Sequence, residues 1–296
     1  RDAEDCFFEP EAAEYYIEFI ETCCTHIEGQ LAGVPFLLED WEKAIVANLF
    51  GWYRTDALGR IVRRYRKGFI YVPRKNGKTP LVAAIHNAVL FDSHCTPEAG
   101  QINNLAAASR DQASKLFRHI VGMIRNEPEM EKRCQIFATT RSVTKPDNSV
   151  TKVIPADENV AHGDNPHLQV VEELHAQPSP KLYEALVSAM SSANRLNGLL
   201  LLVTTADFSR PSICNTEYDY AVKVRDGIVS DPSYLPVIYE AMHLDAEGRW
   251  VEDDWTREDT WYKANPNLGV SKSIDYMREA CLRAKEDPAF ENTFKR

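Results

Sequence analysis

The feature that most constrains this chain is residues 72–79, which read VPRKNGKT. The apolar run at residues 68–71 precedes it, and a helix-forming run that begins at Leu81 follows it. A strand that ends in such a loop aims backbone N–H groups and a helix N-terminus at one point, where a polyphosphate is stabilised. The pattern therefore predicts a strand, a phosphate-binding loop and a helix, in that order.

Two side chains of this loop fit the chemistry of a bound nucleotide. Lys78 is placed to bridge the β- and γ-phosphates, and the Thr79 hydroxyl is placed to hold Mg²⁺. The match to the pattern G-x-x-x-x-G-K-[ST] is incomplete, because Val72 occupies the first glycine position. Taken alone the loop is weak evidence, and its meaning depends on other elements of the chain.

A second element is the apolar run at residues 168–171, which ends in Glu172 and Glu173. In nucleotide hydrolases with this layout, the first acid holds Mg²⁺ or its water shell and the second polarises the attacking water. We therefore expect Glu172 at the metal and Glu173 at the water. The alternative for such a pattern in isolation is an ordinary strand end followed by an exposed acidic turn.

A third element is residues 199–207, which read LLLLVTTAD. The run is too short for a membrane span and has the length of a strand buried on both faces. Because the carboxyl ends of parallel strands share one edge of a sheet, we expect Thr204 and Thr205 beside the loop and the acids. There they can sense the γ-phosphate; the alternative is that they only cap the strand.

Composition and charge limit the class of protein. The 296 residues are 44% hydrophobic and 26% charged, which is ordinary for a soluble chain, and we expect an intracellular protein that contacts no membrane. The formal net charge is −10, yet eight Lys and Arg and no acid lie between Arg60 and Lys78. Alternation at residues 61–66 predicts a strand with one basic face, hairpin-paired with residues 68–72. That face is either solvated or a track for DNA, opposite an acidic stretch at residues 240–259.

Helical and strand patterns alternate along most of the chain. Helices are expected at residues 11–26, 40–50, after the phosphate loop, and at 110–126, 181–191, 216–226 and 273–286. Strands are expected at residues 102–108, 134–138, 150–155, 168–172, 199–205 and 234–240, with loops at 157–166 and in the acidic stretch. Such alternation implies an α/β fold with a mainly parallel sheet covered by helices on both faces. We expect a core domain over residues 1–211 and a smaller lid or linker unit over residues 212–296.

In this order, the motifs resemble the ATPase portion of the large terminase subunit of tailed bacteriophages, over nearly the whole chain. Besides the elements above, the resemblance rests on residues 36–42, 108–113, 170–176, 204–206 and 261–269. It implies a P-loop NTPase core of the ASCE or RecA-like type, and hydrolysis of ATP with Mg²⁺ to move double-stranded DNA into a procapsid. It also implies a ring of subunits docked on a portal protein with help from a small terminase subunit, in the host cytoplasm and transiently on the procapsid.

The resemblance assigns roles to individual residues. Nucleotide binding falls to Trp41, Pro73, Arg74, Lys75, Asn76, Gly77, Lys78, Thr79, Thr204 and Thr205. Catalysis falls to Glu173, Lys78 and Arg74, and Mg²⁺ to Thr79 and Glu172. An arginine finger from a neighbouring subunit is expected in a ring ATPase, with Arg141 the first candidate and Arg210 the second. A surface salt bridge is the alternative role for either arginine.

The chain departs from the family pattern at a few positions. Glu42 stands where the adenine-side motif usually has Gln, Glu172 replaces the commoner Asp, and Asp207 follows residues 204–206 where a small residue is usual. The nuclease domain of the family does not fit before Arg296, so we expect no nuclease activity. The acids Asp253, Asp254, Glu258 and Asp259 are expected in a solvated loop, and His162 and His175 in packing or loop hydrogen bonds.

Two other functions also fit these motifs. One is a helicase-like P-loop DNA translocase with a different role, which a second full-sized ATPase lobe would favour. The other is a nucleotide-binding scaffold that assembles without turnover of its own.

Overall fold

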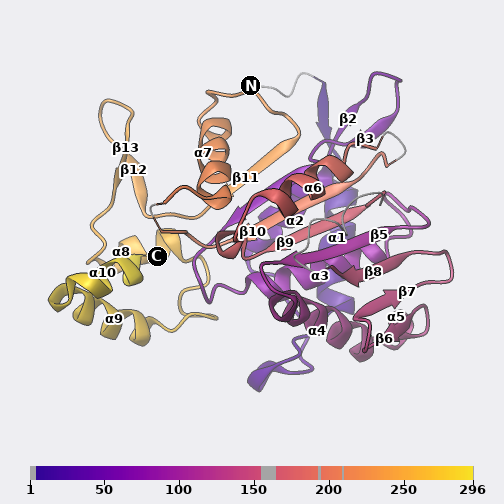
Figure 1. Cartoon of the computed structure of the whole chain (residues 1–296), viewed down its shortest axis with the longest axis horizontal. Helices are drawn as coiled ribbons and strands as arrows, with labels where there is room; N and C mark the ends of the chain where they lie inside the picture. The colour runs from indigo at the N-terminus through magenta and orange to yellow at the C-terminus, as the bar shows by residue number, and fades with distance from the viewer. Residues whose placement is uncertain (1–4, 155–164, 193–194, 209, 296) are drawn as a thin grey trace.

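An eight-stranded sheet forms the centre of the molecule (Figure 1). The computed structural model describes residues 5–154, 165–192, 195–208 and 210–295. In spatial order the strands are β11 (Tyr234–Ile238), β4 (Lys67–Tyr71), β10 (Leu199–Thr204), β9 (Leu168–Glu172), β5 (Ile102–Ala107), β8 (Val150–Val153), β7 (Ser142–Thr144) and β6 (Gln135–Phe137). The strands from β11 to β8 are parallel, and β7 and β6 add an antiparallel edge. This topology confirms the predicted mainly parallel sheet.

The order of the strands brings the three predicted motifs to one edge. Strand β10 lies between β4, which leads into the phosphate loop, and β9, which ends in Glu172. In the register of these strands, Thr204 is opposite Tyr71, and Val203 is opposite Glu172. The loop, the acids and the threonines therefore leave the sheet at the same level.

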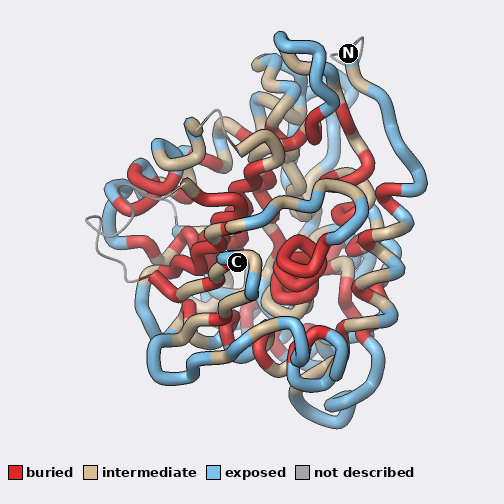
Figure 2. Tube along the Cα trace, turned by 90° about the vertical axis from the view of Figure 1, so that its right-hand side faces the viewer, coloured by how far each residue is buried: buried red, intermediate tan, exposed pale blue. Residues whose placement is uncertain are grey.

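Helices cover both faces of the sheet, as predicted. One face packs against α1 (Pro10–Cys23), α2 (Asp40–Gly51), α3 (Lys78–Leu90) and α4 (Arg110–Asn126), and the other against α6 (Lys181–Ala189) and α7 (Ile213–Arg225). Along β10, Leu199, Leu201 and Val203 belong to the first core and Leu200 and Leu202 to the second, because successive side chains point to opposite faces. Figure 2 shows the buried residues at the centre of the molecule, with exposed residues around them.

The predicted hairpin between residues 61–66 and 68–72 is wrong. Strand β3 (Ile61–Arg63) instead pairs with β2 (Trp52–Thr55), which also pairs with β1 (Cys6–Phe8) in a small antiparallel sheet. Strand β4 is buried on both faces between parallel neighbours, a setting that a solvent-facing hairpin does not provide. The prediction of an exposed basic strand face is also wrong for Arg63. Its side chain is buried, with Cζ 5.3 Å from the centre of the Phe50 ring.

The C-terminal part differs in two ways from the expected pattern. Strand β11 joins the central sheet beside β4, so residues after 212 contribute to the core as well. The stretch predicted as an acidic loop holds a hairpin of β12 (Met242–Leu244) and β13 (Trp250–Glu252) and the start of α8 (Glu258–Ala264). These strands are short and mostly exposed, so they leave no alternating pattern in the sequence. Where a second unit begins stays a prediction.

The last helices form a small cluster of their own. Helices α8, α9 (Ile274–Glu286) and α10 (Pro288–Lys295) pack around Trp261, Leu268 and Met277, and Figure 1 shows them in yellow at one end of the molecule. Nearby, Asp253 forms an ion pair with Lys263 at 2.8 Å, and the Glu258 carboxylate pairs with an arginine at the same distance.

The other helical elements among the described residues are short. They are α5 (Pro128–Glu131) and the 3₁₀ turns Gly29–Leu31 and Leu174–Ala176. The predicted loop at residues 157–166 lies mostly outside the described residues, and His162 lies wholly outside them. None of the helices in the described ranges has the length and apolar character needed to cross a membrane.

Candidate nucleotide-binding site

The loop between β4 and α3 has the backbone shape of an anion-binding turn. Lys75 and Gly77 have φ angles of 68° and 80°, and α3 begins directly afterwards at Lys78. Alternation of left-handed and right-handed residues turns successive N–H groups toward one side, where an anion is held. Glycine is required at position 77 for this φ and for space, because a Cβ there would lie 3.1 Å from Nδ2 of Asn267.

Lys78 is folded back onto the loop. Its Nζ donates to the carbonyl oxygens of Val72 at 2.7 Å and Pro73 at 2.9 Å. Burial lowers the pKa of Lys78 to about 8, while the carboxylates of Glu173 and Glu172 act in the opposite direction. The ammonium group is therefore still mostly protonated at neutral pH and available to a phosphate.

Thr79 and Glu172 join the loop to the end of β9. The Thr79 hydroxyl donates to Oε1 of Glu172 at 2.5 Å. Glu172 is 5% exposed, and this burial raises its pKa to about 7. A hydroxyl and a carboxylate beside a phosphate-binding loop are the hard oxygen ligands that Mg²⁺ prefers, so these residues fit that ion.

Glu173 leaves the strand in a different direction from Glu172. Its φ of 53° and ψ of 50° are left-handed, a conformation that is uncommon for residues other than glycine and gathers at functional sites. The side chain is 32% exposed, whereas that of Glu172 is buried. One acid is thus held against Thr79 while the other reaches toward solvent.

His175 connects Glu173 to Thr204. Its Nδ1 lies 3.1 Å from Oε2 of Glu173 and 3.2 Å from Oγ1 of Thr204, which also accepts from the His175 backbone N–H at 3.1 Å. An ionised carboxylate only accepts hydrogen bonds, so the contact with Glu173 places a proton on Nδ1. The Thr204 hydroxyl can then donate to the carbonyl of Thr205, 2.9 Å away. Loop hydrogen bonds were predicted for His175, but the link to Glu173 was not.

A cavity of about 550 Å³ lies between the loop and the two acids. Lys78, Thr79, Glu172, Glu173 and His175 all line it, together with Arg74, Lys75 and Gly77. The predicted loop and the predicted acids therefore meet in one open space.

Helix α4 supplies a wall of this cavity that sequence reasoning missed. Gln112, Lys115 and His119 line the cavity, and the charge of Lys115 helps to lower the pKa of Glu172 against the effect of burial. Their spacing of three and four residues places them on one face of a helix. That polar face was the signal in the sequence that could have found them.

Comparison with known proteins identifies the family. The model of the family "Terminase large subunit, ATPase domain" matches residues 40–223. The chain belongs to this family. It is 28% identical over 287 residues to the terminase large subunit of Enterobacteria phage HK97, a match that covers 95% of this chain and 51% of that protein. A second relative, protein YmfN of Escherichia coli (strain K12), is 30% identical over 133 residues, covering 45% of this chain and 27% of that protein.

The fold agrees with this assignment. The crystal structure of the HK97 bacteriophage large terminase matches with a TM-score of 0.75 at 27% identity, covering 96% of this chain and 53% of that chain. The chain thus spans about half the length of the HK97 large terminase. The predicted resemblance and the predicted P-loop fold class are both confirmed.

Not every predicted nucleotide contact lines the cavity of this terminase domain. Trp41 is buried, and its indole N–H donates to Oδ1 of Asn267 at 2.8 Å. Thr204 and Thr205 are fully buried, and Thr204 bonds to His175. Asn76 is buried, and the carbonyl of the half-buried Pro73 accepts from Nδ2 of Asn76 at 3.1 Å and from Nζ of Lys78 at 2.9 Å. The roles of these residues stay predictions.

The two arginine-finger candidates lie outside the cavity. Arg141 has a φ of 52° in the turn before β7, at the sheet edge where the acids lie. Three strand spacings of about 4.8 Å separate β7 from β9, roughly 14 Å in all. Arg210 is 55% exposed, pairs with Asp207 at 3.2 Å and donates to the carbonyl of His175 at 3.3 Å. The role of either arginine as a finger for a neighbouring subunit stays a prediction.

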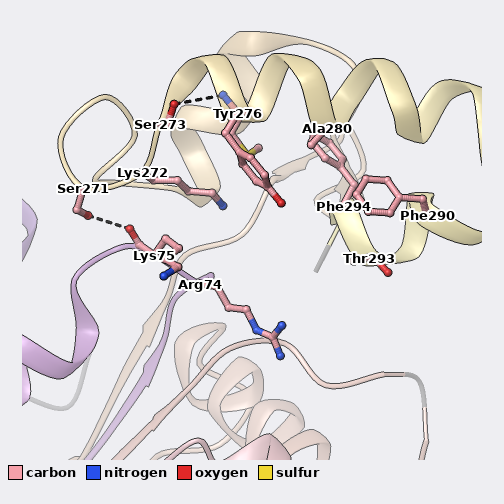
Figure 3. Close-up of a pocket in the computed structure, with 11 residues that line it drawn as sticks. Arg74, Lys75, Ser271, Lys272, Ser273, Tyr276, Ala280, Phe290, Thr293 and Phe294 are labelled. Carbon is pink, nitrogen blue, oxygen red and sulfur yellow. Dashed lines mark hydrogen bonds between the residues drawn. The ribbon is translucent and has the colours of Figure 1, made fainter. Parts of the chain in front are cut away.

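A second cavity, of about 570 Å³, also has Arg74 and Lys75 in its wall. Figure 3 shows that its other side comes from the last helices, with the rings of Tyr276, Phe290 and Phe294. The C-terminal helices therefore come close to the phosphate loop.

Proposed function

We propose that this chain is the ATPase motor part of a large terminase subunit, which hydrolyses ATP with Mg²⁺ to translocate double-stranded DNA into a procapsid. One observation carries the proposal. Lys78 and Thr79 from the loop and Glu172 and Glu173 from β9 lie around one cavity, with Thr79 bonded to Glu172. Membership of the terminase family and the likeness to the HK97 protein support it.

The proposed reaction is in-line attack of water on the γ-phosphorus, which breaks its bond to the β–γ bridging oxygen and releases ADP and phosphate. The Glu173 carboxylate orients this water and takes its proton, while His175 holds the carboxylate in place. Lys78 exchanges its carbonyl contacts for phosphate oxygens and neutralises their charge. When bound, Mg²⁺ supplies further neutralisation of the phosphate oxygens, and Thr79 and Glu172 are the residues that would hold it, directly or through water.

Other residues are proposed to assist from around the cavity. Arg74 and Lys75 add positive charge in the loop, and Lys115 adds it from α4. Arg141 of a neighbouring subunit is proposed as the arginine finger, because it lies at the same edge of the sheet and outside the cavity of its own chain. The proposed partners are double-stranded DNA, a portal protein, a small terminase subunit and further copies of this chain in a ring, in the cytoplasm of a bacterial host and transiently on the procapsid.

We propose a division into a core domain and a lid or linker unit, as the sequence predicts. The pairing of β11 with β4 favours extending the core beyond residue 211 to the end of β11. The separate cluster around Trp261 favours a lid or linker unit built from α8, α9 and α10.

A steady-state assay of phosphate release from ATP and Mg²⁺ tests the function, with and without DNA, portal protein and small terminase subunit. The matched controls are Lys78→Ala, expected to lose nucleotide binding, and Lys132→Ala, an exposed lysine expected to change nothing. Absence of phosphate release under every condition would overturn the motor and favour a scaffold. Stimulation by DNA without any requirement for the procapsid would favour a helicase-like translocase.

A further inference from the structure

A segment from the C-terminal part of the chain is bound to the phosphate loop. Asn76 in the loop donates from Nδ2 to Oδ1 of Asn265 at 3.0 Å and accepts at Oδ1 from the backbone N–H of Asn267, also at 3.0 Å. Nδ2 of Asn267 donates to the Asn76 carbonyl at 3.2 Å. Figure 3 shows a further contact, in which the Ser271 hydroxyl donates to the Lys75 carbonyl at 2.8 Å. About 190 residues of sequence separate the two sides.

The orientation of each amide in this network is fixed by a group that can only donate. Lys272 Nζ lies 2.6 Å from one of the two end atoms of the Asn265 amide, and because Nζ only donates, this end atom is Oδ1. In the same way, the indole nitrogen of Trp41 lies 2.8 Å from one end atom of the Asn267 amide, which is therefore Oδ1. The backbone N–H of Asn267 sets the Oδ1 of Asn76 in the same way, which leaves Nδ2 of Asn76 to donate. The network therefore has one arrangement.

The network is buried and holds the carbonyl side of the loop. Asn76, Asn265 and Asn267 are 0%, 4% and 4% exposed. Besides Asn265, Nδ2 of Asn76 donates to the carbonyls of Pro73 at 3.1 Å and Arg74 at 3.4 Å. Within the described part of the chain, no acceptor takes the backbone N–H of Asn76 or Gly77. The contacts thus occupy the carbonyl oxygens and leave N–H groups to an anion.

We propose that Asn76, Asn265 and Asn267 are positioning residues that hold the phosphate loop in its anion-binding shape before nucleotide arrives. The inference rests on the proposed function, since it names what shapes that same site. A loop fixed in advance loses less conformational entropy on binding, so the network raises nucleotide affinity. It also gives Trp41 a role through Asn267 rather than through the adenine base.

A double-mutant cycle tests the proposal on the full chain, with MgADP binding measured by calorimetry. Asn76→Ala and Asn267→Ala each weaken MgADP binding by about tenfold, because each removes several contacts of the loop. The double variant binds MgADP about as well as the more weakly binding of the two single variants, within about twofold, because the residues act as one unit. Asn103→Ala is the matched control, since Asn103 is a fully buried amide in β5, away from the loop.

Trp41→Phe removes the indole N–H that bonds to Asn267 but keeps an apolar ring, so it separates positioning from contact with the base. It also tests the proposal if the alanine variants do not fold. Positioning through Asn267 predicts that this variant weakens MgADP and magnesium pyrophosphate by the same factor. A loss confined to MgADP would overturn positioning in favour of base contact.

Two further readouts distinguish positioning from a general loss of stability. In Asn76→Ala the backbone amide of Asn267 exchanges hydrogen at least tenfold faster than in the unchanged chain, and the KM for ATP rises while kcat stays within about threefold. MgADP affinity within twofold of the unchanged chain in the folded variants, or fully additive losses, would overturn the inference alone. If the unchanged chain bound no MgADP, the proposed function would fall, and this inference with it.

Discussion

The Thr79 hydroxyl donates a 2.5 Å hydrogen bond to Oε1 of Glu172, across 93 residues of sequence. The bond ties the first turn of α3 to the end of β9, the two elements that carry the proposed metal ligands. The order of the central sheet makes this contact reachable, because only β10 lies between β4 and β9. A change in the position of either element therefore changes both ligands.

Removing the charge of Glu172 is expected to raise the Mg²⁺ requirement. Glu172→Gln keeps an oxygen that accepts from Thr79 but loses the negative charge that attracts the ion. We expect the Mg²⁺ concentration for half-maximal phosphate release to rise by about 10- to 100-fold. Chelation of Mg²⁺ should stop release in both proteins. Glu129→Gln, at an exposed position, is the control, and an unchanged Mg²⁺ requirement in Glu172→Gln would contradict the metal assignment.

Glu173 is expected to separate nucleotide binding from turnover. Glu173→Gln leaves the loop and Lys78 unchanged but removes the group proposed to take the proton of the attacking water. Turnover should fall by about 10²- to 10⁴-fold while MgATP binding stays within a few fold. Single-turnover phosphate release and equilibrium binding measure the two quantities. Equal losses in both would assign Glu173 to binding instead.

His175 is expected to act on turnover through Glu173. Because its Nδ1 lies 3.1 Å from the Glu173 carboxylate, His175→Ala frees that side chain to leave its position. We expect kcat to fall by about tenfold with little change in the KM for ATP, and His175→Asn to restore part of the loss by supplying a donor. Steady-state kinetics of the two variants measure this split. A rise in KM alone would show that the histidine serves the nucleotide and not the acid.

Glu42 gives a pH-dependent stability with a defined sign. Burial raises its pKa from 4.5 to about 7, so between these values the folded chain holds more protons than the unfolded chain. The free energy of unfolding therefore decreases as the pH rises through this window. Glu42→Gln keeps the oxygen that accepts from the Glu39 N–H and removes the charge. The variant should gain stability over the unchanged chain from pH 4.5 to 8, by at most about 3 kcal/mol. Chemical denaturation at both pH values measures the free energy of unfolding of the two proteins. If their difference did not increase from pH 4.5 to pH 8, the burial of an ionised Glu42 would be contradicted.

The residues that line the cavity from the loop and from the end of β9 were predictable, because each group is carried by a short stretch of sequence. The loop at residues 72–79 and the two acids after an apolar run each show their residue types at fixed spacing. Their meeting at one edge follows from parallel strands, which the alternation of helices and strands predicts.

Contacts that depend on chain pairing were not predictable in this way. The alternation at residues 61–66 led to the mistaken hairpin, because it gives no sign that β4 is buried on both faces and pairs with β11 from far along the chain. In the same way, the bonds of Asn265 and Asn267 to the loop join segments whose local patterns carry no sign of each other. The polar face of α4 was predictable only in part. The spacing of Gln112, Lys115 and His119 is visible in the sequence, but the contact of this face with the cavity is not.

The pairing of β11 with β4 sets a minimum length for a stable, monodisperse form of this domain. A chain that ends at residue 211 lacks β11, and β4 becomes the outermost strand with a free row of backbone N–H and C=O groups next to Phe69 and Ile70. An apolar strand with an open side pairs readily with other molecules. The chain of residues 1–211 should therefore aggregate, whereas residues 1–240 should stay monodisperse, as light scattering can measure. The seventh helix and the strand that follows it thus protect the sheet that carries the phosphate loop from self-association.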